Sequence, residues 1–119
     1  MLLIALLLTA AAPVQTQAAM NRSAGSSYAQ ADAAMTAQWK RTYAYMKGRD
    51  AQDTSRGGGF GYAGALLESQ RAWLKYRDTQ CVVEGGVYAG GSMQPMVSAQ
   101  CRATLTRART AQLKALVAR

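Results

Sequence analysis

Hydrophobic residues recur at three- and four-residue spacing along three segments of this chain, which is the period of an α-helix that buries one face. The first segment covers about residues 27–47, where Ser26 or Ser27 can serve as N-cap and Gly48 ends the pattern. Its apolar stripe consists of Met35, Trp39, Thr42 or Tyr43, and Met46. The pattern therefore predicts a first helix with one buried face.

Two more segments repeat this period. The second covers about residues 63–82, and the third starts between Met96 and Ser98, with Pro95 close to its first turn. The inner face of the second helix is predicted to hold Leu66, Leu67, Gln70, Trp73, Leu74, Arg77 and Cys81. The stripe of the third helix is predicted to hold Cys101, Leu105, Ala108, Gln112, Leu113 and Leu116. No segment alternates at period two over enough length for a strand, so the predicted fold class is all-α, a three-helix antiparallel bundle.

Two connections join these helices. Residues 49–62 include three consecutive glycines, and residues 83–95 form a second glycine-rich loop. Because each connection joins antiparallel neighbours, the two are expected at opposite ends of the bundle. We expect residues 49–62 to be the more mobile, since glycine permits many backbone conformations and no covalent bond closes this connection.

The N-terminal segment has the pattern of a secretory leader. Residues 1–12 form an apolar run about as long as a signal-peptide core and too short to span a bilayer. A cut after Ala18 would place Thr16 and Ala18 at the two small-residue positions, whereas a cut after Ala12 would leave Pro13 next. The other interpretation is a buried N-terminal helix of the mature fold.

We expect residues 1–18 to be a signal peptide and residues 19–119 to be a single domain, periplasmic or secreted, with no transmembrane segment after cleavage. Cys81 and Cys101 are the two cysteines of the chain and border the second connection. In an oxidising compartment such a pair forms a disulfide. This bond would join the second helix to the third.

The charge of the chain is strongly basic. Lys and Arg number 14 against 6 Asp and Glu, which gives a net charge of +8. Such a balance favours anionic partners, among them the anionic polymers and lipids of a cell envelope. The basic residues are scattered singly rather than clustered, which argues against specific nucleic-acid binding. The alternative is that the charge serves solubility alone.

The residue types argue against catalysis and against a metal or cofactor site. The chain has no histidine, and two paired cysteines leave no thiolate. Glu68 and Asp78 are ten residues apart on one helix, too far for a close carboxylate pair, and Asp50 with Asp53 is too sparse for a metal. Residues 59–64 match G-x-G-x-x-G, but the hydrophobic strand that a dinucleotide site requires does not precede them. We expect no enzyme activity.

A family resemblance rests on the second and third helices. The second carries Gln-Arg-Ala-Trp-x-x-Tyr-Arg-Asp-x-x-Cys from Gln70 to Cys81, and Gly90-Gly91-Ser92 follow in the loop. The third carries Cys101 and Thr106-x-x-Arg109-x-x-x-Leu113, while Asp32, Met35 and Trp39 fit a looser first-helix pattern. Over about residues 31–116 the chain resembles the lysozyme-inhibitor LprI-like domain family. The resemblance implies a small exported helical domain and, for the member that names the family, inhibition of lysozyme.

The resemblance also has a departure with a structural consequence. An additional cysteine pair near the first helix and a lipid-anchoring cysteine, both common in the family, are missing here. We therefore expect the first helix to be held by packing alone.

The motif residues are interpreted as structural: Gln70, Trp73, Tyr76, Arg77, Asp78, Thr106, Arg109 and Leu113. Trp73 fits a core anchor, and an inward Arg77 needs a carboxylate or helix-end carbonyls as partner. The disulfide between Cys81 and Cys101 acts as a staple between the second and third helices. Counting residues away from it along both helices predicts these facing pairs: Arg77 with Leu105, Leu74 with Ala108, Trp73 with Arg109, Gln70 with Gln112, and Leu66 with Leu116. The register predicts the Arg109 guanidinium on the Trp73 ring, and a close approach of the two helices at Ala108.

Candidate partner contacts lie in both connections: Arg56, Tyr62, Tyr88 and Met93. Animal-type lysozymes are basic and would repel this chain at long range, although their catalytic cleft is acidic. Arg56 has the chemistry for such a cleft, whereas the stapled loop is more rigid but has no basic residue. We predict a non-catalytic lysozyme-inhibitor-like binding protein. The alternatives are a basic envelope-binding module for anionic polymer or lipid, and a purely structural periplasmic protein.

Overall fold

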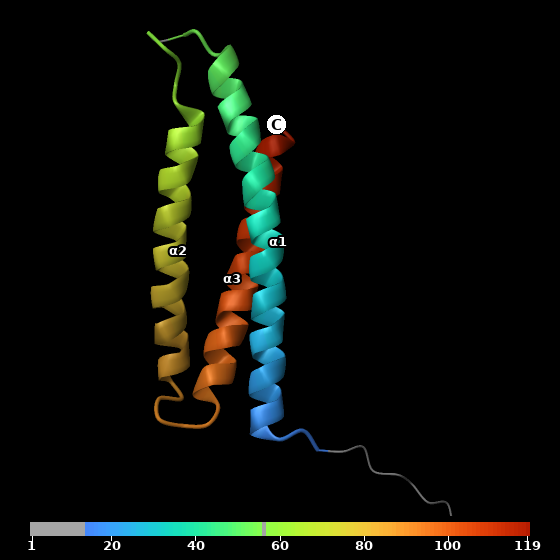
Figure 1. Ribbon diagram of the computed structural model, residues 1–119. Coiled ribbons are helices and arrows are strands. Elements are labelled where there is room, and N and C mark those ends of the chain that lie inside the picture. Colours follow the sequence, from blue (N-terminus) through green and yellow to red (C-terminus); the bar gives the residue numbers. More distant parts are fainter. Residues whose placement is uncertain (1–13, 56) are drawn as a thin grey trace, which may run out of the picture.

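The computed structural model describes residues 14–55 and 57–119, and these form three helices. They are α1 (Gln17–Gln52), α2 (Tyr62–Gly86) and α3 (Gln94–Val117), with no strand among the described residues. Consecutive helices run antiparallel, with the α1–α2 connection at one end of the bundle and the α2–α3 connection at the other (Figure 1). The predicted all-α antiparallel bundle is confirmed. Most of the predicted signal peptide falls on residues 1–13, which lie outside the described residues.

Helix α1 is longer at both ends than the sequence pattern predicts. It begins after Thr16, whose hydroxyl accepts a hydrogen bond from the Ala19 N–H at 3.1 Å. The expected N-cap at Ser26 or Ser27 and the expected end at Gly48 are therefore wrong. Gly48 is not among the glycines with positive φ, so it keeps the right-handed conformation and does not terminate the helix.

Helices α2 and α3 also extend beyond the predicted bounds. The connection between them is residues 87–93, shorter than the predicted 83–95. Gly85, in the last turn of α2, is buried, and a Cβ there would lie 3.4 Å from the Ser98 Cβ. The small residue lets the end of α2 lie close against the start of α3.

The core lies where all three helices meet. Its buried members are Met35, Met46, Ala63, Leu66 and Leu113. Partly buried side chains pack around them: Trp39, Tyr43, Tyr45, Tyr62, Trp73, Leu74 and Leu116. Both tryptophans therefore contribute to the core, and Leu66 and Leu116 join the same cluster as the register predicts.

The predicted buried face of the third helix is only partly right. Ala103, Thr106 and Arg109 are buried in addition to Cys101 and Leu113, whereas Ala108 and Gln112 are exposed. The predicted close approach at Ala108 is therefore wrong. The physical reason is that α3 packs more extensively on α1 than on α2, so its buried face is turned toward α1.

Polar contacts also connect α1 to the other helices. The Thr42 hydroxyl donates to the Leu113 carbonyl at 3.0 Å and accepts from Gln38 Nε2 at 3.1 Å, in a fully buried position. Asp32 forms an ion pair with Arg77 of α2. The expectation that the first helix is held by packing alone is therefore wrong. Among the described helices, none is both long and apolar enough to cross a bilayer.

The stapled end and the motif residues

The disulfide joins Cys81 at the end of α2 to Cys101 in α3, as predicted. Their Cα atoms are 5.5 Å apart and their positions in the sequence differ by 20. Cys81 is completely buried and Cys101 is 8% exposed. A carboxylate oxygen of Glu84 lies close to the two sulfurs, and Glu, Cys and Cys are residue types that can bind a metal ion. Because the sulfurs are bonded to each other, neither is a thiolate ligand.

Arg77 is at the centre of the motif on α2. Its Nε donates to Asp78 Oδ1 at 3.0 Å, and its Nη1 donates to Asp32 Oδ1 at 3.3 Å and to Thr106 Oγ1 at 3.4 Å. The guanidinium also lies 5.4 Å from the centre of the Trp73 ring. A buried arginine requires such partners, and here it links all three helices.

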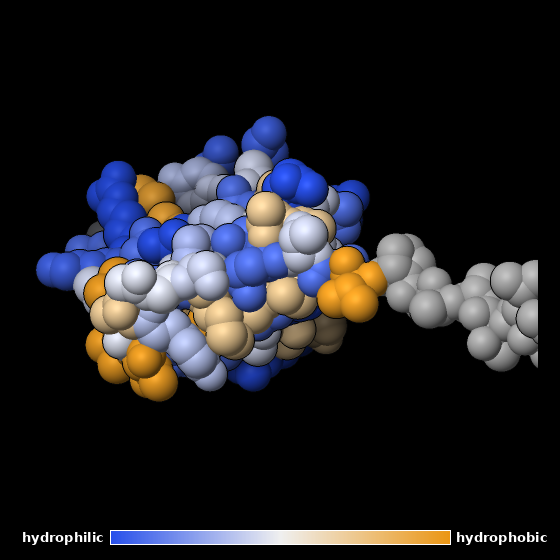
Figure 2. Space-filling view, turned by 90° about the horizontal axis from the view of Figure 1, so that it is seen from below, coloured by the Kyte–Doolittle hydropathy of each residue, from blue (hydrophilic) through white to orange (hydrophobic). Residues whose placement is uncertain are grey.

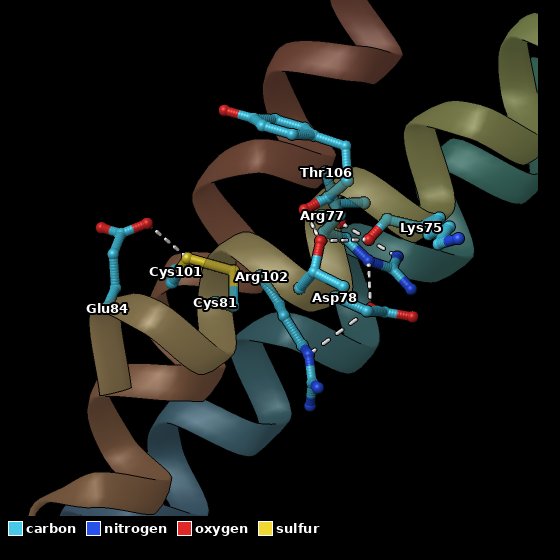
Figure 3. The surroundings of a disulfide bond; sticks show 10 residues. Lys75, Arg77, Asp78, Cys81, Glu84, Cys101, Arg102 and Thr106 are labelled. Atoms are coloured by element: carbon cyan, nitrogen blue, oxygen red, sulfur yellow. Dashed lines mark hydrogen bonds and ion pairs between the residues drawn. A yellow bond between two sulfur atoms is a disulfide. The ribbon is translucent and has the colours of Figure 1, made fainter. Parts of the chain in front are cut away.

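Asp78 extends this cluster to α3. Its Oδ1 lies 3.6 Å from Arg102 Nε, so the carboxylate stands between two guanidinium groups (Figure 3). Tyr76, between Lys75 and Arg77, is 53% exposed and is the one motif residue directed to solvent to this extent. Thr106 and Leu113 are completely buried.

Arg109 fills the space between α2 and α3. Its guanidinium carbon lies 5.8 Å from the Trp73 ring centre, which agrees with the predicted register. Nε donates to Gln70 Oε1 at 2.9 Å, Nη2 to the Ser69 hydroxyl at 3.1 Å, and Nη1 to Gln112 Oε1 at 3.4 Å. Burial lowers the pKa of Arg109, because desolvation disfavours the charged form, but an arginine remains protonated at neutral pH.

The structure divides the candidate contact residues between the two ends of the bundle. Tyr62 begins α2, where its ring packs under the Arg49 guanidinium at 4.0 Å and against the Phe60 ring at 4.7 Å. It is half-buried and belongs to the packing around the core. Arg56 lies outside the described residues. Tyr88 and Met93 are exposed at the opposite end.

The α1–α2 connection is organised by two carboxylates. Asp50 accepts from the N–H groups of Tyr62 at 2.6 Å and Ala63 at 2.9 Å, and so caps α2 from outside. Asp53 accepts from the Ser55 hydroxyl at 2.6 Å, the Ser55 N–H at 2.9 Å and the Phe60 N–H at 3.1 Å. The Ser55 hydroxyl, followed by these two N–H groups, lowers the pKa of Asp53.

The stapled end carries a cluster of exposed hydrophobic side chains, which we call the apolar tip: Val82, Val83, Val87, Tyr88 and Met93. Val87 is 81% exposed and Val83 is 67% exposed. Figure 2 looks onto this end and shows hydrophobic residues at the surface among hydrophilic ones. From Val82 to Gln100 the single charged residue is Glu84. Large exposed apolar patches are common at protein–protein contact sites.

The backbone of the apolar tip is fixed by hydrogen bonds to its neighbours. Gly90, with φ +78°, donates its N–H to Gln94 Oε1 at 3.1 Å. Asn21 Nδ2, in the second turn of α1, donates to the Ser92 carbonyl at 3.3 Å. The tip is therefore attached to α1 and α3 and closed by the disulfide.

The rest of the surface is basic, because most carboxylates are used internally. Asp32 and Asp78 pair with buried or half-buried arginines, and Asp50 and Asp53 bind backbone N–H groups. Nine exposed cations have no carboxylate partner among the described residues: Arg22, Lys40, Arg41, Lys47, Arg71, Lys75, Arg107, Lys114 and Arg119. The long sides of the bundle are cationic, and the apolar tip is not.

The sequence pattern places Val82 at the end of a helix and Val83 and Val87 in a loop, and it does not identify these three residues as a contact surface. The signal was present, since Val82 and Val83 follow the last stripe residue, Cys81, without a polar interruption. It also missed the capping role of Asp50. That role depends on the extension of α1 past Gly48, which carries the carboxylate to the start of α2.

These features define a disulfide-stapled three-helix domain whose motif residues join the helices to one another. The family described as "Lysozyme inhibitor LprI" matches residues 9–113, and the chain belongs to this family. The chain is also 40% identical over 107 residues to "Uncharacterized protein R02472" of Rhizobium meliloti (strain 1021), covering 86% of this chain and 74% of that protein. No solved structure matches it.

Proposed function

We propose that this protein is exported, binds a lysozyme and inhibits it without catalysing a reaction. Membership of the lysozyme inhibitor LprI family supports the class of partner. The observation that carries the proposal is the apolar tip, which is exposed, hydrophobic and closed by the disulfide, in a segment from Val82 to Gln100 that has no basic residue. A rigid contact surface loses little conformational entropy on binding, which favours tight complexes.

The charge distribution supports an end-on approach. Animal-type lysozymes are basic, so the cationic sides of this bundle are repelled by them at long range. The tip is the part of the chain that such an enzyme meets with least repulsion, since Glu84 is the single charge between Val82 and Gln100. Tyr88 and the valines would then be buried in the complex, where a few anchor residues, among them tyrosines, contribute most of the affinity.

A lysis assay tests the proposal. The turbidity of a suspension of bacterial cell walls is followed with an animal-type lysozyme and increasing amounts of the oxidised protein. We expect inhibition, and we expect Val87→Asp to raise the concentration for half inhibition about tenfold or more, because it places a charge in the apolar contact. Tyr88→Ala should weaken inhibition as well.

Phe60→Ala is the matched control, since Phe60 is a large exposed hydrophobic residue at the opposite end (52% exposed). It should inhibit like the unchanged protein, and so should Arg56→Ala. Absence of inhibition by the unchanged protein contradicts the function. Loss of inhibition in Arg56→Ala with full inhibition by Val87→Asp contradicts the assignment of the binding end.

A second candidate function is supported by the nine exposed cations that lack carboxylate partners. They suit an envelope-binding module that holds anionic polymer or lipid along the sides of the bundle. Co-sedimentation with cell-wall polymer or with anionic vesicles distinguishes this function. Binding that is lost between low and moderate salt, without inhibition of lysozyme, favours the envelope module.

A further inference from the structure

Glu84 makes an unusual contact with the disulfide. Its Oε2 lies 2.8 Å from the Cys101 sulfur. A sulfur bonded in a disulfide carries no hydrogen, so this contact is the approach of a carboxylate oxygen to the sulfur and not a hydrogen bond. In Figure 3 the carboxylate lies on the side of the Cys101 sulfur that faces away from Cys81.

That position matters for thiol chemistry. Disulfides are broken when a thiolate attacks one sulfur and the other sulfur leaves, and the attacking atom approaches from the side opposite the leaving group. Glu84 therefore occupies the path by which a thiolate reaches Cys101. A carboxylate there obstructs the path and repels a negatively charged reagent.

The two cysteines differ in their access to solvent. Cys81 is completely buried, whereas Cys101 lines a groove of about 280 Å³ together with Glu84, Val97, Gln100, Thr104 and Leu105. A small thiol fits this groove. Glu84 is its one charged wall residue.

We propose that the Cys101 sulfur is the site of thiol–disulfide exchange in this protein and that Glu84 selects the thiol by charge. Thiols with a cationic group react there in preference to thiols with an anionic group. The exposed carboxylate moves aside for the incoming thiol and pairs with its ammonium group. An anionic thiol receives no such compensation.

The exchange proceeds in two steps. A thiolate bonds to the Cys101 sulfur, the bond between the two cysteines breaks, and its electron pair stays on the Cys81 sulfur, which takes a proton from solvent. A second thiolate attacks the sulfur of the small molecule, releases the Cys101 thiolate and leaves the oxidised disulfide of the reagent. Two small thiols supply both electrons.

The long-range field opposes this selectivity, which makes the test decisive. A net charge of +8 attracts anionic reagents to the molecule as a whole. A preference for cationic thiols can therefore arise only from local charge near the sulfur. Removing that charge should let the long-range field determine the order of reactivity.

The experiment compares reduction of the oxidised full chain by cysteamine, 2-mercaptoethanol and 2-mercaptoethanesulfonate at low ionic strength. Each rate is divided by the rate of the same thiol with an uncharged model disulfide, which removes differences in thiol pKa and nucleophilicity. The cation-to-anion rate ratio of the unchanged protein should exceed that of Glu84→Gln about tenfold. Coulomb's law gives this factor for a charge about 6 Å away in water.

Glu68→Gln is the matched control, because it makes the same change of net charge about 24 Å away along α2. Its rate ratio should equal that of the unchanged protein. If Glu84→Gln only loosened the fold, all three thiols would react faster and the ratio would not change. A ratio in Glu84→Gln no different from that in Glu68→Gln overturns the proposal.

The site of attack is checked independently. Quenching the reaction early and locating the mixed disulfide by tandem mass spectrometry should find the thiol on Cys101. A mixed disulfide on Cys81 contradicts the proposal, whatever the rates. Neither measurement involves lysozyme, so this inference stands or falls apart from the proposed function.

Discussion

The two ends of the bundle fix antiparallel neighbours by different means. The stapled end uses a covalent bond, a hydrogen bond donated by Asn21 and one accepted by Gln94, and it carries the apolar tip. The opposite end, which contains the α1–α2 connection and which we call the linker end, uses two carboxylates, Asp50 and Asp53, that bind backbone N–H groups. Both ends are therefore fixed without their exposed hydrophobic side chains, which are the five of the apolar tip at one end and include Phe60 at the other, so the side chains of the tip remain available for a partner.

Removal of the staple should have the largest effect. The bond closes a loop of 20 residues, and by chain-entropy arithmetic this contributes about 3 kcal/mol. Cys81→Ser should therefore lower the melting temperature by roughly 12–20 °C, followed by circular dichroism. The double variant Cys81→Ser/Cys101→Ser controls for reactions of a lone thiol. A change of a degree or two would show that hydrogen bonds and packing hold this end alone.

Arg109, midway between the two ends, should have the next largest effect. Arg109→Lys keeps the charge but cannot reproduce the hydrogen bonds to Ser69, Gln70 and Gln112 or the planar contact with Trp73. We expect a loss of about 1–3 kcal/mol in urea unfolding. Inhibition of lysozyme should be unchanged in folded protein. Loss of inhibition at full stability would place Arg109 in the contact surface instead.

The linker end should respond less to the loss of a single carboxylate. Asp50→Ala leaves the Tyr62 and Ala63 N–H groups without their acceptor and should cost about 1 kcal/mol in the same urea measurement. Asp50→Asn, which retains an acceptor oxygen, should lose less. If Asp50→Ala destabilises the protein as much as Cys81→Ser does, the linker end depends on its cap as much as the stapled end depends on its disulfide.

The smallest effect should be a local one of pH. The pKa of Asp53 is lowered in the folded chain, so its contribution to stability is present above its ordinary value of 3.8. That contribution is lost as the pH falls through the lowered pKa. Amide exchange at Phe60 should show the linker opening in that acid range, and Asp53→Asn should remove the dependence.

Amide exchange at neutral pH sharpens the same comparison. We expect faster exchange in the linker, residues 53–61, than in residues 87–93 of the stapled end, because no covalent bond closes the linker. Slower exchange in the linker would reverse the ranking of the two ends.

The sequence was sufficient to predict the features that depend on the helical period of hydrophobic residues and on the number of residues from the disulfide. Three helical stripes, two cysteines and the register from Cys81 back to Trp73 predicted the bundle, the staple and the contact with Arg109. It was insufficient where tertiary packing decides. A glycine at position 48 predicts the end of a helix, but α1 continues to Gln52. The contact of Asp50 with the start of α2 stabilises this extension, and that contact cannot be read from the residue type of Gly48.

The buried face of α3 shows the same limit. Counting from the staple treats α2 as the only neighbour of α3 and therefore places Ala108 inside. The buried face of α3 packs against both α1 and α2, and it contains Thr106 and Arg109 instead of Ala108. Of the apolar tip, the sequence predicted Tyr88 and Met93 as contact residues but not Val82, Val83 and Val87, because helical periodicity does not show whether a hydrophobic side chain at the end of a helix is buried or exposed.

The hydrogen bond between the Thr42 hydroxyl and the Leu113 carbonyl has a consequence for the order of folding. The two residues are 71 positions apart, and α1 packs more on the last helix than on its neighbour α2. During synthesis the first helix emerges before its main neighbour, and the part of its buried face that packs on α3 stays uncovered until the C-terminal helix is complete. Helices α2 and α3 can pair early, since their contacts span a short loop, but closure of the bundle must follow release of nearly the whole chain.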